Sequence, residues 1–282
     1  MMDLTIVGPG RAGMSIALAA HRAGHSIGAV VGRTLGSAEA AADRVQATPF
    51  GIDADFPSGE LMLISSRDDV IEELASSIAG RIAPGVSAGV VHLSGLVPRS
   101  ALAPLRDAGY LTGTFHPLQT LPNPDSGAAQ LAGAWVGITA DDLEPKLVEF
   151  AESLGLKPFS IADDKKSLYH AAAAAAANFP LGSLAMSYDL FAEAGVPFEA
   201  AQPLVEAIVG NAFELGPRAA LTGPVARGDV GTVRKQLDAV AVAEPGWIGD
   251  FVSAIRVLAR LSGNLPLFDE MLDNWKRSEA SR

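Results

Sequence analysis

The chain has 282 residues, of which 49% are hydrophobic and 19% charged, so it is long enough for about two globular domains and too apolar to be disordered. Its formal net charge of −11 argues against a surface that binds nucleic acid or anionic membranes. The absence of cysteine excludes disulfides, thiolate catalysis and cysteine-bound zinc, and we expect no metal site. Neither a signal peptide nor a membrane-spanning run is expected, which predicts a cytoplasmic protein.

A predicted strand over residues 4–7 runs directly into a glycine-rich turn, which opens a helical pattern over residues 14–23. The turn has G-x-G-x-x-G spacing, in which glycine allows a tight bend, a close approach of the backbone to a pyrophosphate and close packing of helix on strand. The free N–H groups and the positive end of the helix stabilise a bound phosphate. We therefore predict a dinucleotide site formed by Gly8, Pro9, Gly10, Arg11, Ala12 and Gly13.

A second predicted strand, residues 26–31, ends at Gly32-Arg33-Thr34. An acidic residue at this point of a dinucleotide-binding unit holds the ribose 2′-hydroxyl of NAD, whereas an arginine suits the 2′-phosphate of NADP. No carboxylate lies between Val30 and Ser37. The sequence therefore predicts NADP(H), with Arg33 on the phosphate and Thr34 donating a hydroxyl. The alternative is that Arg33 is an ordinary solvated residue at the end of a strand.

Short apolar runs alternate with helical segments up to residue 161, as they do in doubly wound α/β folds with a parallel sheet. The further predicted strands cover residues 61–65, 90–93, 111–114, 135–138 and 158–161, and a helix covers residues 70–79. Ser65 and Ser66 join the predicted cofactor site, because ligands bind at the carboxyl ends of parallel strands. Residues 120–127, with the sequence TLPNPDSG, are expected to form an exposed loop.

The pattern changes at residues 163 and 164, after which only helices are predicted. Two domains are therefore expected, an α/β domain over residues 1–163 and an all-helical domain over residues 164–282. The predicted helices cover residues 165–191, 199–215, 229–241, 247–262 and 267–277. Pro180 is expected to kink or break the longest of them. A surplus of apolar helical faces predicts a homodimer through the helical domain.

Two polar clusters follow the fourth and fifth predicted strands. His92, Ser94 and Gly95 form the first, and His116 and Gln119 belong to the second. At the carboxyl ends of the strands they are expected to line a substrate pocket, with His116 also a candidate catalytic group. A histidine in such a position is as readily a satisfied structural group, and this alternative stays open for His92.

A third cluster begins the longest predicted helix. Lys166, Tyr169 and His170 share one face, because positions i, i+3 and i+4 are neighbours on a helix. Asn178 follows two turns beyond His170. We predict that Lys166, His170 and Asn178 are catalytic and that Tyr169 lines the substrate pocket, since a lysine in a dry site can donate a proton. Arg227 is a candidate carboxylate clamp, or simply part of a helix-capping turn.

Taken together, the segments GPGRAG, HLSGL, HPLQT, KSLYH followed by Asn178, and LTGPVARGD resemble one bacterial Rossmann-like family over nearly the whole chain. The C-terminal half of that family is a domain of unknown function, similar to the C-terminal helical domains of the 6-phosphogluconate dehydrogenase superfamily. Relatives in the superfamily include ketopantoate reductase, pyrroline-5-carboxylate reductase, β-hydroxyacid dehydrogenases and prephenate dehydrogenases. The resemblance implies a Rossmann sheet domain followed by a helical domain, with the active site between them.

The resemblance also implies an activity. Lys166 occupies the place of the lysine that acts on the substrate oxygen in ketopantoate reductase, although His170 rather than asparagine stands one turn later. We therefore expect an NADPH-dependent reductase of a small 2-oxo acid, with ketopantoate the best single guess and a carboxylate as the ligand. A second hypothesis is an oxidation with His116 as general base, because HPLQT is similar to the His-Pro-Met segment of prephenate dehydrogenases. A third is a non-catalytic NADP-binding sensor or assembly protein.

Overall fold

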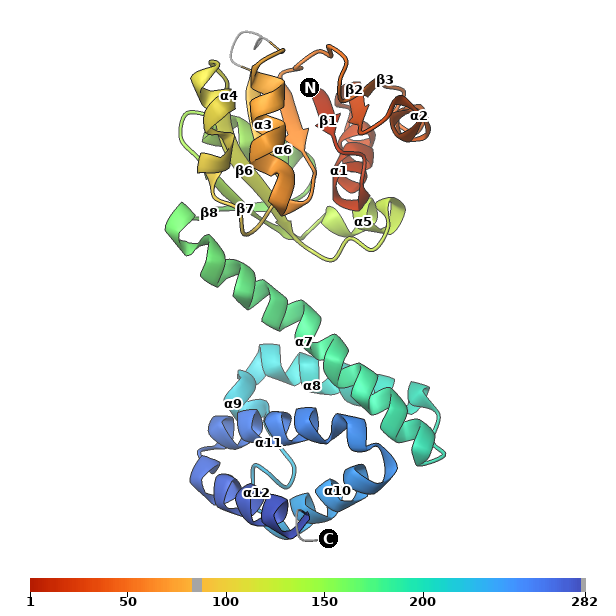
Figure 1. Ribbon diagram of the computed structural model, residues 1–282, viewed down its shortest axis with the longest axis vertical. Coiled ribbons are helices and arrows are strands. Elements are labelled where there is room, and N and C mark those ends of the chain that lie inside the picture. The colour runs from red at the N-terminus through yellow and green to blue at the C-terminus, as the bar shows by residue number, and fades with distance from the viewer. Residues whose placement is uncertain (83–87, 280–282) are drawn as a thin grey trace. The chain divides into compact units, whose positions relative to one another are not determined.

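The computed structural model describes residues 1–82 and 88–279. The chain divides into two compact units, Met1–Ala177 and Asn178–Arg282. The first is built of strands and helices and the second of helices (Figure 1). The division falls inside a long helix rather than at its start, because the first turns of that helix pack against the sheet of the first unit. Within the described residues, no helix combines the length and the apolar character that crossing a membrane would require.

The described residues of the first unit form one sheet of eight strands in the order β3-β2-β1-β4-β5-β6-β7-β8. All seven predicted strands are present, and one strand, β3, was missed because its sequence TPFG carries a proline and a glycine and is short. The doubly wound α/β prediction is confirmed. The strands are β1 (Asp3–Val7), β2 (Ser26–Gly32), β3 (Thr48–Gly51), β4 (Leu61–Ile64), β5 (Gly89–His92), β6 (Leu111–Leu118), β7 (Trp135–Ala140) and β8 (Lys157–Ser160).

The sheet is parallel except for one pair, since β6 and β7 are antiparallel and β8 runs parallel to β7. Strand β6 continues four residues past the predicted end at Thr114 and carries Pro117 inside it. This is tolerated because β5 pairs with β6 only as far as Thr114. Beyond that residue β6 has a neighbour on one side alone, so the missing N–H of proline interrupts no ladder on the open side.

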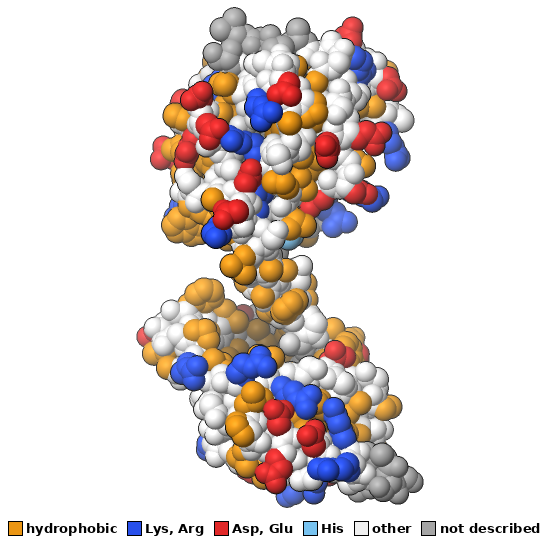
Figure 2. Space-filling model, turned by 60° about the vertical axis from the view of Figure 1, so that its left-hand side comes forward, with side chains coloured by type: hydrophobic (Ala, Val, Ile, Leu, Met, Phe, Trp, Pro, Cys, Tyr) orange, Lys and Arg blue, Asp and Glu red, His pale blue; other side chains and the backbone are white. Residues whose placement is uncertain are grey.

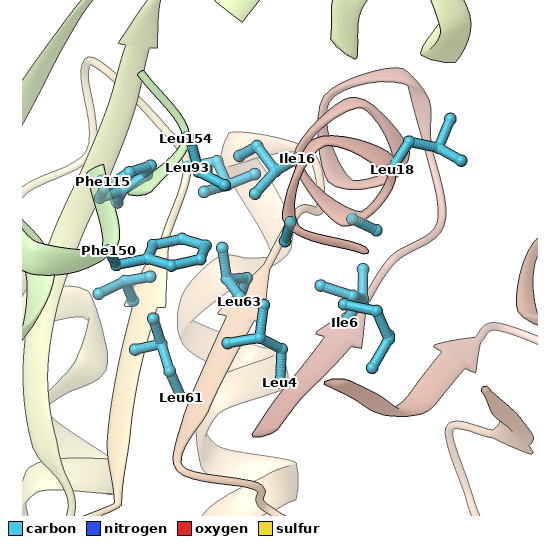
Figure 3. Packing of buried hydrophobic residues seen from close by; sticks show 14 of the residues in the cluster. Leu4, Ile6, Ile16, Leu18, Leu61, Leu63, Leu93, Phe115, Phe150 and Leu154 are labelled. Carbon is cyan, nitrogen blue, oxygen red and sulfur yellow. The ribbon is translucent and has the colours of Figure 1, made fainter. Parts of the chain in front are cut away.

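Helices cover both faces of the sheet. One core lies between the sheet and α1, α2, α5 and α6, and the other between the sheet and α3 and α4. Leu61 and Leu63 of β4 point into the first core, seen in Figure 3, whereas Met62 and Ile64 point into the second. This alternation is the strand period of two. The helices are α1 (Arg11–Arg22), α2 (Leu35–Asp43), α3 (Ile71–Ala79), α4 (Ala103–Asp107), α5 (Pro124–Leu131) and α6 (Glu144–Ser153), with short 3₁₀ turns η1 (Asp68–Val70), η2 (Arg99–Leu102) and η3 (Asp163–Lys165).

The segment expected to be a loop over residues 120–127 is partly helical, so that prediction was wrong. Helix α5 begins at Pro124, where proline is tolerated because the first N–H of a helix has no partner. The side chain of Asn123 caps the helix by accepting the N–H groups of Asp125 and Ser126 at 3.1 and 3.0 Å. The Asn-Pro pair that indicated a loop is therefore a helix start.

The helices from α7 onward are α7 (Lys166–Glu193), α8 (Gln202–Leu215), α9 (Pro217–Ala220), α10 (Val230–Ala243), α11 (Ile248–Ser262) and α12 (Leu265–Glu279), with 3₁₀ turns η4 (Phe198–Ala201) and η5 (Pro245–Trp247). Helix α7 runs through Pro180 without ending there, so the predicted break does not occur. Pro180 has no N–H to donate to the carbonyl of Ala176, so the helix loses one hydrogen bond. Both residues are exposed, so this carbonyl is accessible to water.

The second unit has its own core, formed by α10, α11 and α12 around Phe268, Leu237 and Ala259, all of which are fully buried. The Trp247 indole N–H donates to Asp189 at 2.7 Å and ties η5 to α7. Helix α8, in contrast, contains no buried residue, and Phe213 on it is 90% exposed. Hydrophobic side chains are also exposed along α7, as Figure 2 shows.

Candidate cofactor and catalytic site

The glycine turn between β1 and α1 has two glycines that packing requires and one that faces open space. Gly8 has a φ of +91°, and a Cβ added there would lie 2.4 Å from the Ser65 carbonyl oxygen. A Cβ on Gly13 would lie 2.6 Å from the carbonyl oxygen of Gly8. A Cβ on Gly10 would meet nothing within 4 Å. The outer glycines therefore allow strand and helix to pack, and the middle one leaves room for a ligand against the backbone.

The chemistry of this turn suits an anion. Gly10 is the N-cap of α1 and supplies no side-chain hydrogen bond to the first turn of the helix. Free N–H groups at a helix start attract phosphate. At the end of the neighbouring strand β4, the Ser66 Oγ is buried and has no hydrogen-bond partner among the described residues. The donors present therefore fit the pyrophosphate of a dinucleotide.

Arg33 and Thr34 follow β2 and are exposed. Thr34 is the N-cap of α2, where its Oγ1 accepts the N–H of Ser37 at 3.3 Å. The Thr34 hydroxyl hydrogen is not used by this cap and is available to a ligand. In the part of the chain that the structure describes, Arg33 forms no ion pair, so its guanidinium is available to a phosphate. The predicted roles of both residues remain predictions.

The register of the sheet places the carboxyl ends of β1, β4 and β5 at one level with Thr114 of β6. Val7 of β1 pairs with Ile64, Ile64 pairs with His92, and His92 pairs with Thr114 of β6. Neighbouring strands lie about 4.8 Å apart, so the strand that precedes the glycine turn and Thr114 are separated by roughly 14 Å across the sheet. The polar clusters predicted after β5 and β6 thus share one edge with the glycine turn.

His92 is fully buried and both of its ring nitrogens have partners. Its Nδ1 accepts the N–H of Ser94 at 3.2 Å, and its Nε2 lies 3.4 Å from the Pro98 carbonyl oxygen. Burial, followed by the positive charge of Lys166, lowers the pKa of His92 to about 4. The ring is therefore neutral, and its two contacts hold the loop after β5.

The side chain of Ser94 also forms its hydrogen bonds within this loop. Its Oγ accepts the N–H groups of Leu96 and Val97 at 3.1 and 3.0 Å, which folds residues 94–97 into a tight turn. Its carbonyl oxygen accepts a hydrogen bond from Lys166. Ser94 therefore holds the backbone of the loop after β5 in place.

Lys166 is the single buried residue among the 28 of α7. Its side chain is 1% exposed, and its Nζ donates to the Ser94 carbonyl at 3.2 Å and to the Thr114 hydroxyl at 3.1 Å. Burial lowers the pKa of Lys166 to about 8, against the opposing effect of Asp163 and Asp68. The group is thus mostly charged at pH 7 and lies beneath the surface. In this arrangement it anchors α7 to the sheet.

His116 and Tyr169 form a hydrogen-bonded pair. The His116 Nδ1 lies 2.7 Å from the Tyr169 hydroxyl oxygen, and the two rings meet edge to face at 5.5 Å. Burial, followed by the charges of His170 and Lys166, lowers the pKa of His116 to about 4. Burial raises the pKa of Tyr169 to about 12. Both groups are therefore neutral at pH 7.

Two glycines allow this pair to pack. A Cβ on Gly95 would lie 2.7–2.9 Å from three ring atoms of His116. Gly137 of β7 pairs with His116 of β6, and a Cβ added to it would lie 3.3 Å from the Tyr169 hydroxyl oxygen. His170, on the same helix, has its ring 5.9 Å from that of His116, and its Nδ1 is buried without a partner in the described structure.

The remaining predicted site residues lie apart from this pair or in the second unit. Gln119 has its amide bonded to the Thr120 N–H at 2.8 Å and to the Gln130 carbonyl at 3.3 Å, so it holds the segment before α5. Asn178 and Arg227 belong to the second unit, and both are exposed there. Arg227 lies in a turn that Asn264 stabilises by donating to the carbonyls of Val225 and Ala226.

Sequence reasoning missed Thr114 and Gly137. The Thr114 hydroxyl accepts a hydrogen bond from Lys166. Thr114 lies two residues before His116 and therefore on the same face of β6, so strand alternation was the signal that could have identified it. Gly137 carries no such signal, because its importance depends on the antiparallel pairing of β7 with β6.

Two families match the sequence. Residues 1–117 match the Rossmann-like domain, and residues 134–249 match a domain of unknown function, DUF2520. Among curated proteins, none matches the sequence.

Solved structures resemble the chain over most of its length. A candidate NADP oxidoreductase from Bacteroides fragilis has 24% identity and a TM-score of 0.77, covering 92% of this chain and 98% of its own. A protein from Thermotoga maritima has 21% identity and a TM-score of 0.74, covering 92% and 99%. An imine reductase from Myxococcus stipitatus in complex with NADP+ has 15% identity and a TM-score of 0.63, covering 96% and 99%. At these identities the likeness establishes the fold.

Proposed function

We propose that this member of the family that joins a Rossmann-like domain to DUF2520 is an NADP-dependent oxidoreductase, acting as a reductase of a small carbonyl compound. One observation carries the proposal: the open glycine cradle and a cluster of side chains with strongly shifted pKa values lie at the same edge of one sheet. Shifted pKa values in a cluster beside a ligand cradle are typical of active sites.

The cofactor assignment rests on the residues of the first unit. The turn from Gly8 to Gly13 would hold the pyrophosphate, Ser66 would donate its free hydroxyl, and Arg33 and Thr34 would bind the 2′-phosphate. NADP is also the cofactor named for the proteins from Bacteroides fragilis and Myxococcus stipitatus. When bound, NADPH supplies the hydride, and the protein supplies position, electrostatics and a proton.

The charge of Lys166 favours an oxygen acceptor. An alkoxide develops negative charge when a carbonyl is reduced, and a buried ammonium nearby stabilises it. A cationic iminium would instead be repelled by the same group. We therefore propose a 2-oxo acid as the substrate, with ketopantoate as the first compound to test, and cyclic imines as the competing class. The buried position of Lys166 assigns it this electrostatic role in place of direct proton donation.

The alternative oxidation needs His116 as a general base. A histidine whose pKa is about 4 is a weak base at neutral pH, so the site favours reduction over proton abstraction from an alcohol. The third alternative, a non-catalytic NADP-binding protein, is an outcome of the experiment below.

The test is a fluorescence titration with NADPH and NADH, followed by NADPH oxidation against a panel of 2-oxo acids, ketopantoate and cyclic imines. Tighter binding of NADPH and turnover of a 2-oxo acid are expected. Equal or tighter binding of NADH contradicts the cofactor assignment. Tight NADPH binding with no turnover across the panel favours the non-catalytic alternative, and turnover of imines alone contradicts the carbonyl assignment.

We also propose that the second unit forms a homodimer interface. The exposed apolar side chains of α8, with Phe213 90% and Leu204 66% exposed, support this assignment, because large apolar side chains exposed along one helix are commonly covered by a partner. Sedimentation of the wild type and of a Phe213→Glu variant tests it. A wild type that sediments as a monomer at micromolar concentration contradicts the proposal.

A further inference from the structure

Tyr169 and His116 form a hydrogen-bonded pair whose direction decides whether the phenolic proton is free. Their 2.7 Å contact joins Tyr169 Oη to His116 Nδ1, and two descriptions of it are possible. Either the phenol donates to the ring and its proton is occupied, or the ring donates Nδ1–H to the phenol and the phenolic hydrogen is free.

We propose that Tyr169 donates the proton in the reduction, and that His116 positions it by donating its Nδ1–H to the phenolic oxygen. The inference rests on the proposed function. It assigns to Tyr169 the acid role first predicted for Lys166, whose Nζ is buried and donates to Ser94 and Thr114.

Packing fixes Tyr169 in this orientation. Its ring lies edge to face with His116 at 5.5 Å and with Phe159 at 5.8 Å. Its hydroxyl lies over Gly137, the position on β7 where no side chain intervenes. The ring is therefore held from three sides, which is the preorganisation that an acid catalyst requires.

The protonation states agree with this arrangement. Burial raises the pKa of Tyr169 to about 12, so the phenol keeps its proton over the working range of pH. Burial lowers the pKa of His116 to about 4, so the ring is neutral and has one N–H to donate. An imidazolium would add a charge next to Lys166, and the neutral ring avoids it.

The carbonyl carbon accepts a hydride, the π pair of the C=O bond moves to the oxygen, and that oxygen takes the proton as the O–H bond of Tyr169 breaks. The phenolate that remains is stabilised by the N–H of His116 and regains its proton from water. An alkoxide is a stronger base than a phenolate, so the transfer is favourable.

The tautomer of His116 is measured without cofactor or substrate. Long-range ¹H–¹⁵N correlation NMR of the whole protein at pH 7 distinguishes Nδ1–H from Nε2–H, with a His116→Asn variant used to assign the signals. We expect a neutral ring with Nδ1–H. An Nε2–H tautomer overturns the proposal, because the phenolic proton is then donated to the ring.

Kinetics then separate the catalytic group from the positioning group. Tyr169→Phe is expected to lower kcat by about 10²- to 10⁴-fold, with the Kd for NADPH within twofold of wild type. In His116→Asn the amide nitrogen takes the place of Nδ1, so kcat is expected to stay within about tenfold. In His116→Gln the nitrogen lies one carbon further away, and kcat is expected to fall as far as in Tyr169→Phe.

Three results overturn the inference: wild-type kcat in Tyr169→Phe, equal losses in His116→Asn and His116→Gln, or the Nε2–H tautomer. Failure of the proposed function is recognised separately. If the protein fails to bind NADPH or reduces nothing in the panel, the proposed function fails, and the tautomer still decides whether the hydroxyl of Tyr169 is free to donate.

Discussion

Replacing Gly95 by alanine tests the packing of the candidate site most directly. The added Cβ would lie 2.7 Å from Cε1, 2.8 Å from Nδ1 and 2.9 Å from Nε2 of His116. An ordinary contact between carbon atoms is about 3.5 Å, so the ring has to move by roughly 0.8 Å. The Tyr169 hydroxyl has little freedom to follow, because it lies over Gly137 and against Phe159. The 2.7 Å contact of His116 with Tyr169 is therefore disturbed.

The expected loss is larger for catalysis than for stability. A misplacement of about 1 Å in a positioned catalytic group costs on the order of 10²-fold in rate. Loss of one hydrogen bond costs about 1 kcal/mol, which lowers Tm by only a few degrees in a domain of this size. We therefore expect kcat of Gly95→Ala to fall by roughly 30- to 100-fold, while the Kd for NADPH stays near that of wild type.

A double-mutant cycle identifies the route of the effect. If Gly95→Ala acts by displacing His116 from Tyr169, it has no further effect on kcat in the Tyr169→Phe background. Gly80→Ala serves as the matched control, because a Cβ there meets nothing closer than 3.7 Å. The reasoning is refuted if Gly95→Ala retains wild-type kcat, or if its loss adds in full to that of Tyr169→Phe.

Three further predictions concern other parts of the first unit. Gly10→Ala is expected to leave Tm unchanged and to weaken NADPH binding at least tenfold, which a fluorescence titration measures. Gly8→Ala is expected to lower Tm in a thermal melt, because its Cβ meets the Ser65 carbonyl oxygen at 2.4 Å. The folded pKa of Lys166, about 8, lies below its ordinary 10.5, so the unfolded chain binds more protons between these values and stability rises with pH there, by up to about 3 kcal/mol. Urea unfolding should show this rise in the wild type but not in Lys166→Met. The folded pKa of His92, about 4, lies below 6.5, so its contribution is present above pH 6.5 and lost as the pH falls to 4; a His92→Asn variant with an unchanged slope over that range would contradict this.

The glycine turn was predictable because its determinants are local. Gly8, Gly10 and Gly13 lie within six consecutive positions, and the strand before them and the helix after them are both visible as hydrophobic patterns. Strands β1, β2, β4 and β5 share this property, since each contains a short apolar run. The direction of β7 was not predictable in this way. Whether β7 runs parallel or antiparallel to β6 depends on the path of the chain through α5, and the Asn123-Pro124 pair that starts this helix resembles a loop signal.

The candidate site was likewise predictable only in part. The sequence placed His116, Tyr169 and Lys166 in the site because polar residues at strand ends and at i, i+3 spacing are visible as patterns. It did not separate the buried from the accessible groups. Lys165 and Lys166 are adjacent and chemically identical, yet one is exposed and the other is 1% exposed. The difference arises from Ser94 and Thr114, whose oxygen atoms meet Lys166 only when β5, β6 and α7 are assembled.

The burial of Lys166 in turn accounts for the position of Tyr169. An ammonium taken out of water is costly unless oxygen atoms surround it, and Lys166 has the carbonyl of Ser94 and the hydroxyl of Thr114. These contacts fix the first turn of α7 against the sheet. Tyr169 follows three residues later, on the same face of the helix, and is thereby brought to His116 of β6. Lys166 therefore also determines where the phenol lies, so its loss is expected to reduce kcat through the position of Tyr169 as well as through the loss of its charge.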